Sequence, residues 1–194
     1  MDNIINLLTK EQSQKIKVVE IDKNITLFHE NDICDSLGVV LEGELIISSY
    51  SYKGNELIYN HLYENDIFGI NLIFSREPKY QGNVTSLKKS KVALIKKPQL
   101  LSFLSNNEAF MVEYLKRQSD FGKRANSMLK LLSLSDAEER FIYYLKLNKN
   151  VIFVKNVTDL AAKLFFSRET VSRLITKLSK KNIIVRKGHL IKLI

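Results

Sequence analysis

The chain has 194 residues, 45% of them hydrophobic and 26% charged, an ordinary balance for a globular protein of one large or two modest domains. Its one cysteine, Cys34, excludes an intrachain disulfide and any cluster held by several thiolates of one chain. No apolar run approaches the roughly 18 residues of a membrane-spanning helix, and Met1-Asp2-Asn3 lacks the basic start of a secretory signal. We therefore expect a cytoplasmic protein with no membrane partner. For Cys34 we expect a buried or idle thiol, with redox sensing as the alternative.

The net charge of +9 is concentrated in the C-terminal third. Residues 135–194 carry 13 Lys and Arg against 5 Asp and Glu, whereas residues 1–134 carry 17 against 16. This asymmetry is typical of a domain that neutralises nucleic-acid phosphates beside a nearly neutral companion. A basic surface also suits an anionic membrane, but no amphipathic membrane-lying helix accompanies it. Double-stranded nucleic acid is the favoured partner.

The first half of the chain predicts an antiparallel β-sandwich or roll behind a short helical opening at residues 3–16. Short β-rich runs are separated by turn signals at Glu42-Gly43, Lys53-Gly54-Asn55 and Lys88-Lys89-Ser90. The runs are VVEI, TLF, LGVVL, ELIISSY, ELIYNHL, NVTSL and KVALI.

After Pro98 the apolar spacing becomes helical, and it predicts a long helix over residues 107–132. Positions spaced alternately by four and three form the seam of a two-stranded coiled coil, which predicts a homodimer interface. The seam consists of Met111, Leu115, Gln118, Gly122, Ala125, Leu129 and Leu132. A helix packed within one chain is the alternative, because Gln118 and Gly122 weaken the seam at its centre. A second stripe, Tyr114, Phe121 and Met128, could pack on the β-roll.

Residues 133–136 interrupt the helical pattern and predict a hinge. Ser135 or Asp136 is expected to cap the following helix, which carries Phe141, Ile142 and Leu145.

The segment 157–178 predicts a helix, a tight turn and a second helix, because two apolar stripes are interrupted at residues 165–167. Ser167 can cap the second helix. Four side chains then fall on its outward face near the N-terminus: Arg168, Glu169, Ser172 and Arg173. Arg matches guanine O6 and N7, Glu accepts from cytosine N4, and Ser can donate or accept, so the set can contact base edges in a major groove. Solvated charges on a surface hairpin are the alternative.

Residues 182–194 form two short β-rich runs joined by the basic stretch 186–189, which predicts a hairpin that contacts phosphate beside the groove. The residues expected to contact the DNA backbone are Ser167, Thr170, Lys177 and Lys187.

The run SRETVSRL, residues 167–174, followed by a Lys-rich helix end and a short hairpin, resembles the recognition helix and wing of the CRP/FNR family of bacterial transcription factors. The resemblance implies an α+β fold: a cyclic-nucleotide-binding-like β-roll sensor at 1–106, a dimerisation helix and hinge at 107–134, and a winged helix-turn-helix at 135–194. It also implies a non-enzymatic homodimer that binds an inverted repeat with half-sites like TGTGA or TTGA. The family usually has Gly where this chain has Phe165.

The same resemblance bears on the partners. Family activators often contact RNA polymerase through a loop before the winged helix, and here only residues 147–150 are left for that loop.

The stretch 66–84 bears on the ligand of the sensor. Relatives that bind cyclic AMP have a Glu just after a glycine and, further on, an Arg-Ser pair for the phosphate. Here Gly69 is followed by Ile70, and the later pair is Tyr80 and Gln81, so we expect a degenerate effector pocket that does not bind cyclic AMP. Arg76 and Lys79 are the alternative phosphate ligands. Any small-molecule effector stays unidentified.

No cofactor is expected. The cysteine count excludes an iron–sulfur cluster, and His29 and His61 have no spacing distinctive of a haem ligand. The competing interpretation is a small-molecule-binding or enzymatic β-barrel of the cupin type with an incidental basic tail. That fold would need several His and a Glu on facing strands, whereas only these two His lie in the β region. No paired carboxylates or nucleophile motif indicates an enzyme.

Overall fold

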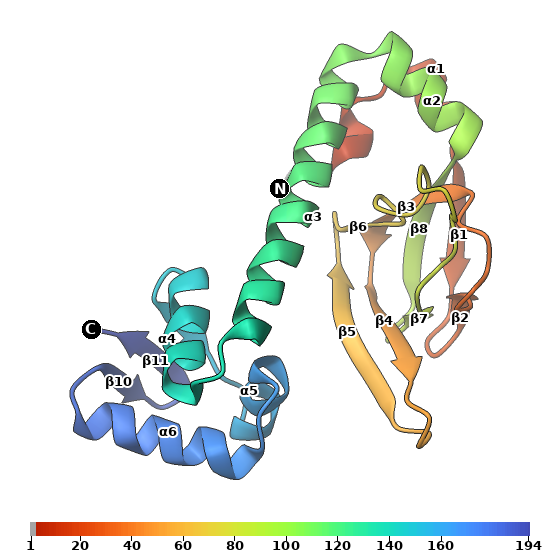
Figure 1. The fold of residues 1–194 in the computed structure, drawn as a ribbon. Helices are drawn as coiled ribbons and strands as arrows, with labels where there is room; N and C mark the ends of the chain where they lie inside the picture. The colour runs from red at the N-terminus through yellow and green to blue at the C-terminus, as the bar shows by residue number, and fades with distance from the viewer. Residues whose placement is uncertain (1–2) are drawn as a thin grey trace. The chain divides into compact units, whose positions relative to one another are not determined.

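The computed structural model describes residues 3–194, and the chain divides into two compact units, one up to residue 121 and one from 122 to 194 (Figure 1). Helix α3 (Glu108–Ser133) continues across this division.

The first unit opens with two short helical segments, η1 (Ile4–Leu7) and α1 (Lys10–Gln14). The Thr9 hydroxyl accepts from the backbone N–H of Gln12 at 3.2 Å, and the Gln12 side chain accepts from the N–H of Thr9 at 3.0 Å. This reciprocal cap satisfies backbone donors that the first helical turn leaves free. The predicted helical opening is therefore present.

Two four-stranded antiparallel sheets form the β-roll, in the strand orders β1-β8-β3-β6 and β2-β7-β4-β5. The strands are β1 (Lys17–Ile21), β2 (Thr26–Phe28), β3 (Ser36–Glu42), β4 (Glu44–Tyr50), β5 (Glu56–Tyr63), β6 (Ile67–Phe68), β7 (Asn83–Ser86) and β8 (Ser90–Lys96). The turn between β3 and β4 depends on Gly43, whose φ is 103° and whose missing Cβ leaves room for Ser90. The predicted β-roll is confirmed.

The core of this unit consists of the inward side chains of both sheets together with the helices that follow them. Leu37, Val39 and Ile95 are fully buried. Helix α2 (Lys97–Asn106) adds Phe103, whose ring meets Phe110 at the start of α3 edge-on, with the ring centroids 6.0 Å apart. The N-terminal part of α3 is thereby anchored on the β-roll.

The second unit contains the C-terminal part of α3 and a three-stranded antiparallel sheet, ordered β10-β11-β9, packed against three helices. Its elements are α4 (Ala137–Leu147), β9 (Val151–Phe153), α5 (Val157–Leu164), α6 (Arg168–Lys180), β10 (Ile184–Lys187) and β11 (Leu190–Leu193). The core is formed by residues such as Phe141, Leu164 and Ile191, all fully buried. This is a winged helix-turn-helix, so the predicted fold class is confirmed.

The cap of α4 resolves one alternative left by the sequence. The Asp136 carboxylate accepts from the backbone N–H of Glu139 at 2.7 Å, so Asp136 and not Ser135 is the N-cap.

Candidate nucleic-acid interface

The N-terminus of α6 begins sharply at a capped serine. The Ser167 hydroxyl accepts from the backbone N–H of Thr170 at 3.1 Å and lies 3.0 Å from the Thr170 hydroxyl. The backbone N–H of Glu169, followed by the Ser167 hydroxyl, lowers the pKa of the Glu169 carboxyl. Glu169 therefore presents an ionised acceptor at the positive end of the helix dipole.

Helix α6 separates an apolar side from a polar one. Its inward residues Val171, Leu174, Ile175 and Leu178 are buried. Its outward residues are exposed, and the four predicted base-contacting side chains, Arg168, Glu169, Ser172 and Arg173, line one hollow of about 370 Å³. The structure thus gathers the predicted set on one accessible surface.

Val157 also lines this hollow, and it was not predicted as a site residue. It is the first residue of α5, directly after the cap residue Asn156, whose side chain accepts from the N–H of Asp159 at 2.8 Å. An Asn followed three residues later by an Asp is typical of a helix start. The sequence could therefore have indicated that Val157 begins the first helix of the helix-turn-helix. Its proximity to α6 depends on the turn between the helices.

That turn contains the departure from the family pattern. Phe165 has φ 57° and ψ 42°, a left-handed conformation, and its ring is 58% exposed. The N–H of Phe166 donates to Ala161 O at 3.0 Å, which closes the end of α5. The tight turn therefore forms without glycine, and the strain on Phe165 is tolerated.

Lys177 does not project freely from α6. Its ammonium group lies 2.7 Å from a carboxylate oxygen of Glu138 on α4, and Lys181 approaches the other oxygen at 3.2 Å. Lys177, then Lys181, lowers the pKa of Glu138, and Glu138 raises the pKa of Lys177. The predicted phosphate-contacting lysine is thus already paired within the chain.

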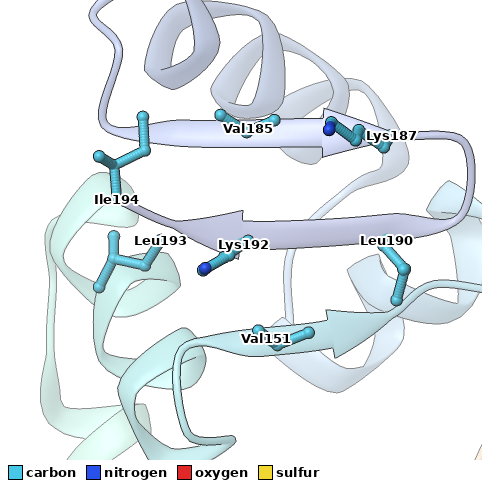
Figure 2. Close-up of a pocket in the computed structure, with 7 residues that line it drawn as sticks. All are labelled: Val151, Val185, Lys187, Leu190, Lys192, Leu193 and Ile194. Carbon is cyan, nitrogen blue, oxygen red and sulfur yellow. The ribbon is translucent and has the colours of Figure 1, made fainter.

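Lys187 lies at the end of β10, before the turn at Gly188 and His189. The outer face of the wing sheet contains a hollow of about 550 Å³, and Figure 2 shows Lys187 beside Leu190 and Lys192 beside Val151. The lining residues are Val151, Val185, Lys187, Leu190, Lys192, Leu193 and Ile194. Within residues 3–194 neither lysine forms an ion pair, so Lys187 is an accessible cation on the wing.

The predicted effector cassette is filled by apolar and aromatic side chains. Ile70 is 6% and Tyr80 3% exposed, and the Tyr80 ring stacks on Phe28 with centroids 4.6 Å apart. Burial raises the pKa of Tyr80 far above its usual range, and it raises the pKa of the neighbouring Cys34 thiol as well. The thiol stays protonated, as expected of an idle buried cysteine.

Gln81 is not part of this buried group. Its side chain is exposed, and its backbone carbonyl accepts from the Tyr59 hydroxyl at 2.5 Å. Gly69 has φ 79°, and a Cβ there would lie 3.0 Å from the Cys34 sulfur. Tyr114 of α3 lies beside this buried group, with its hydroxyl 3.4 Å from the backbone oxygen of Ile70. Burial raises the pKa of Tyr114 to about 12.

The seam positions of α3 are accessible and mostly apolar. Leu115, Leu129 and Leu132 are 53%, 65% and 41% exposed. Met111 is half-buried, and Gly122 and Ala125 are exposed. Gln118 is half-buried, and its side-chain oxygen has no hydrogen-bond partner in the described chain. Such a row of exposed leucines on a long helix is unusual unless another surface covers it.

Comparisons with known proteins agree with the fold described above. A profile of the cyclic nucleotide-binding domain matches residues 18–107. The anaerobic regulatory protein of Bacillus subtilis (strain 168) is 24% identical over 176 residues, which cover 85% of this chain and 74% of that protein. The crystal structure of a CRP family transcriptional regulator from Thermus thermophilus has a TM-score of 0.56 at 15% identity, covering 90% of this chain and 91% of the other. A CooA mutant from Carboxydothermus hydrogenoformans has a TM-score of 0.72 at 18% identity, covering 99% and 91%. The chain therefore contains a region that matches the cyclic nucleotide-binding domain, and its fold is that of these regulator-type structures.

Among the residues described, no three His, Cys, Asp or Glu side chains gather as a metal site. None of the helices described is both long and apolar enough to cross a membrane.

Proposed function

We propose that this chain is a CRP/FNR-type, sequence-specific DNA-binding transcriptional regulator that binds an inverted repeat as a homodimer. The observation that carries the proposal is the gathering of Arg168, Glu169, Ser172 and Arg173 around one hollow at the capped end of α6. Their donors and acceptors match the edges of base pairs in a major groove. The names of two of the similar proteins, an anaerobic regulatory protein and a CRP family transcriptional regulator, support this role and a non-enzymatic function.

Arg173 and Glu169 are proposed as the main base-contacting residues. A guanidinium binds guanine O6 and N7 through two hydrogen bonds, and an ionised carboxylate accepts from cytosine N4. Arg168 and Ser172 complete the set. By the family resemblance, we propose half-sites like TGTGA or TTGA, with centres about 34 Å apart.

A second group of residues is proposed to hold the phosphate backbone without reading sequence. Ser167 and Thr170 offer hydroxyls and backbone N–H groups at the start of α6. Lys187 offers an accessible ammonium on the wing, and Lys177 contributes once it leaves Glu138. The surplus of eight positive charges in residues 135–194 supports this role.

The homodimer is proposed to form along the exposed seam of α3, because burying leucines is favourable at about 25 cal/mol per Å² of apolar surface. Two copies related by a two-fold axis would present two α6 helices to an inverted repeat.

The β-roll is proposed as a sensor that does not bind cyclic AMP, since Ile70 and Tyr80 offer no charge to a buried phosphate. A different small-molecule effector and RNA polymerase are the remaining proposed partners.

Selection from a randomised DNA library tests the proposal. We expect an inverted repeat to be enriched, with each half-site spanning the few base pairs that one recognition helix can contact. Enrichment of a single motif without an inverted copy, or of no motif at all, would exclude the proposed mode of binding.

Alanine variants test the division of roles. Arg173→Ala should lose roughly 1 to 3 kcal/mol per half-site and relax specificity at one base pair only. Lys187→Ala should weaken binding to all sequences alike and lower the slope of log K against log salt by about one unit. Fluorescence anisotropy on specific and random duplexes measures both. Equal losses of specific and non-specific binding in the two variants would contradict the assignment.

A further inference from the structure

The guanidinium of Arg140 on α4 joins two segments that are distant in sequence. Its Nε and Nη2 donate to Leu134 O at 3.0 and 2.5 Å, and Nη2 also donates to Leu132 O at 3.3 Å. Its Nη1 donates to Leu164 O at 3.3 Å. One side chain therefore binds the last turn of α3, the hinge after it and the last residue of α5.

The same guanidinium lies over the ring of Phe166, with its central carbon 4.4 Å from the ring centroid. Phe166 belongs to the turn between α5 and α6, and it packs against the core of this unit. Stacking on an aromatic face adds an attraction beyond the hydrogen bonds. The cation thus also contacts the turn that leads into the recognition helix.

These contacts have a clear physical basis. The last carbonyl groups of a helix have no intrahelical partner, and they carry the negative end of the helix dipole. Leu132 and Leu164 supply such carbonyls from α3 and α5. Arg presents five donors in a rigid planar fork, so a single side chain can satisfy both helix ends, whereas Lys offers a single point charge.

We infer that Arg140 is a positioning residue that fixes α6 relative to the C-terminal end of α3, and thereby sets the half-site spacing that the dimer recognises. The inference rests on the proposed function, because it assumes that two chains join along α3. Buried residues of α5 and α6, among them Leu160 and Val171, share one core, so fixing the end of α5 fixes α6.

The role can be separated from simple stability by changing the spacing of the operator. Adding or removing one base pair between half-sites rotates one relative to the other by about 35°. Two DNA-binding units that are held rigidly discriminate strongly against such a change, whereas two loosely hinged units do not. The ratio of affinities for the selected spacing and for spacings altered by one base pair is therefore the readout.

The experiment compares the wild type with Arg140→Met and Arg140→Lys. Arg124→Met is the matched control, since it removes the same charge from an exposed position on α3. We expect the wild type and Arg124→Met to bind the altered spacings about tenfold more weakly than the selected one. For Arg140→Met we expect that ratio to fall to about threefold or less, with Arg140→Lys between the two because it keeps the charge but loses the fork.

Several outcomes decide the matter. Unchanged spacing ratios in both Arg140 variants would overturn the inference, even if their thermal stability fell. An equal loss of affinity for every spacing would also overturn it, since that result indicates a purely structural role. If Arg140→Met does not fold, the ratio measured for Arg140→Lys decides alone. A wild type that selects no inverted repeat would overturn the proposed function, and this inference with it.

Discussion

Phe165 shows how a single residue can carry strain within a motif that must keep its shape. Its φ of 57° lies in the left-handed region, which costs a residue with a Cβ roughly 1 to 2 kcal/mol. The turn is nevertheless closed by backbone hydrogen bonds and by the burial of α5 and α6 on either side. The surrounding structure imposes the conformation, and the sequence alone left open whether the turn would differ.

Replacing this residue should therefore stabilise the protein. Phe165→Gly removes the left-handed strain and loses little burial, because the ring is 58% exposed. After the larger conformational entropy of glycine in the unfolded chain is subtracted, we expect a gain of about 1 kcal/mol. Urea unfolding measures it. Phe165→Ala, which removes the ring but keeps the strain, is the control, and an equal gain there would attribute the effect to the lost ring.

Glu138 is the residue that most changes the interpretation of the basic surface. Its partners Lys177 and Lys181 are some forty residues away in sequence, so no local pattern could have shown that one carboxylate holds both. Lys177 was predicted as a phosphate contact from its place on the helix alone. In the structure, a phosphate must compete with Glu138 for it.

We predict that Glu138→Gln strengthens binding to all DNA sequences, because it releases two lysines from their ion pairs. The slope of log K against log salt should steepen by about one unit for each lysine that gains a phosphate. Anisotropy titrations at several salt concentrations measure it. Glu139→Gln makes the same charge change at the next residue, and a similar effect there would indicate that net charge alone is responsible.

The same pair predicts a pH dependence of stability. The pKa of Glu138 is below its usual value of 4.5 in the folded chain, so the folded state favours the ionised form. Its contribution to stability is therefore present above that usual value and is lost as the pH falls through the lowered pKa. We expect Glu138→Gln to be less stable than the wild type at neutral pH, with the difference vanishing in acid. A constant difference at all pH values would contradict this account.

At the scale of elements, α3 is a long helix with one face left uncovered. We expect Leu115→Glu with Leu129→Glu to give monomers that also lose operator binding, because a carboxylate in the seam cannot be buried without a partner. Light scattering measures the mass. Lys123→Glu places the same group outside the seam and should leave a dimer. A wild-type mass that matches one chain, or a variant mass equal to that of the wild type, would argue against the seam.

The elements themselves were largely predictable. The seven predicted β runs match strands to within one residue at each end, and the helix predicted at 107–132 is observed at Glu108–Ser133. These elements could be predicted because their apolar residues either alternate strictly with polar ones or keep a helical spacing over a long run. Strand β6 was missed because two residues carry no period. The place of Val157 beside the predicted set and the contacts of Arg140 could not be predicted, because both depend on contacts between separate elements.

At the scale of the whole molecule, the chain combines a nearly neutral β-roll with a strongly basic winged helix. The first matches a cyclic nucleotide-binding domain, yet the positions expected to hold a nucleotide contain other groups. The Tyr80 ring occupies the interior against Phe28, and Ile70 is buried beside Gly69. Sharing this fold therefore does not imply sharing its ligand.

We predict that neither cyclic AMP nor cyclic GMP binds the protein or changes its affinity for DNA. Burying a phosphate without a cation is costly, so we expect a binding free energy less favourable than about −4 kcal/mol, which corresponds to a dissociation constant above about 1 mM. Calorimetry at millimolar nucleotide measures it. Tyr80→Ala tests whether the ring that fills the interior or the missing cation prevents binding. The variant should lose about 3 kcal/mol of stability, because it creates a cavity, and it should still bind neither nucleotide. Saturable heat with the wild type would show that other cations, such as Arg76 and Lys79, bind the phosphate. Saturable heat with Tyr80→Ala alone would show that the ring, and not the missing charge, excludes the ligand.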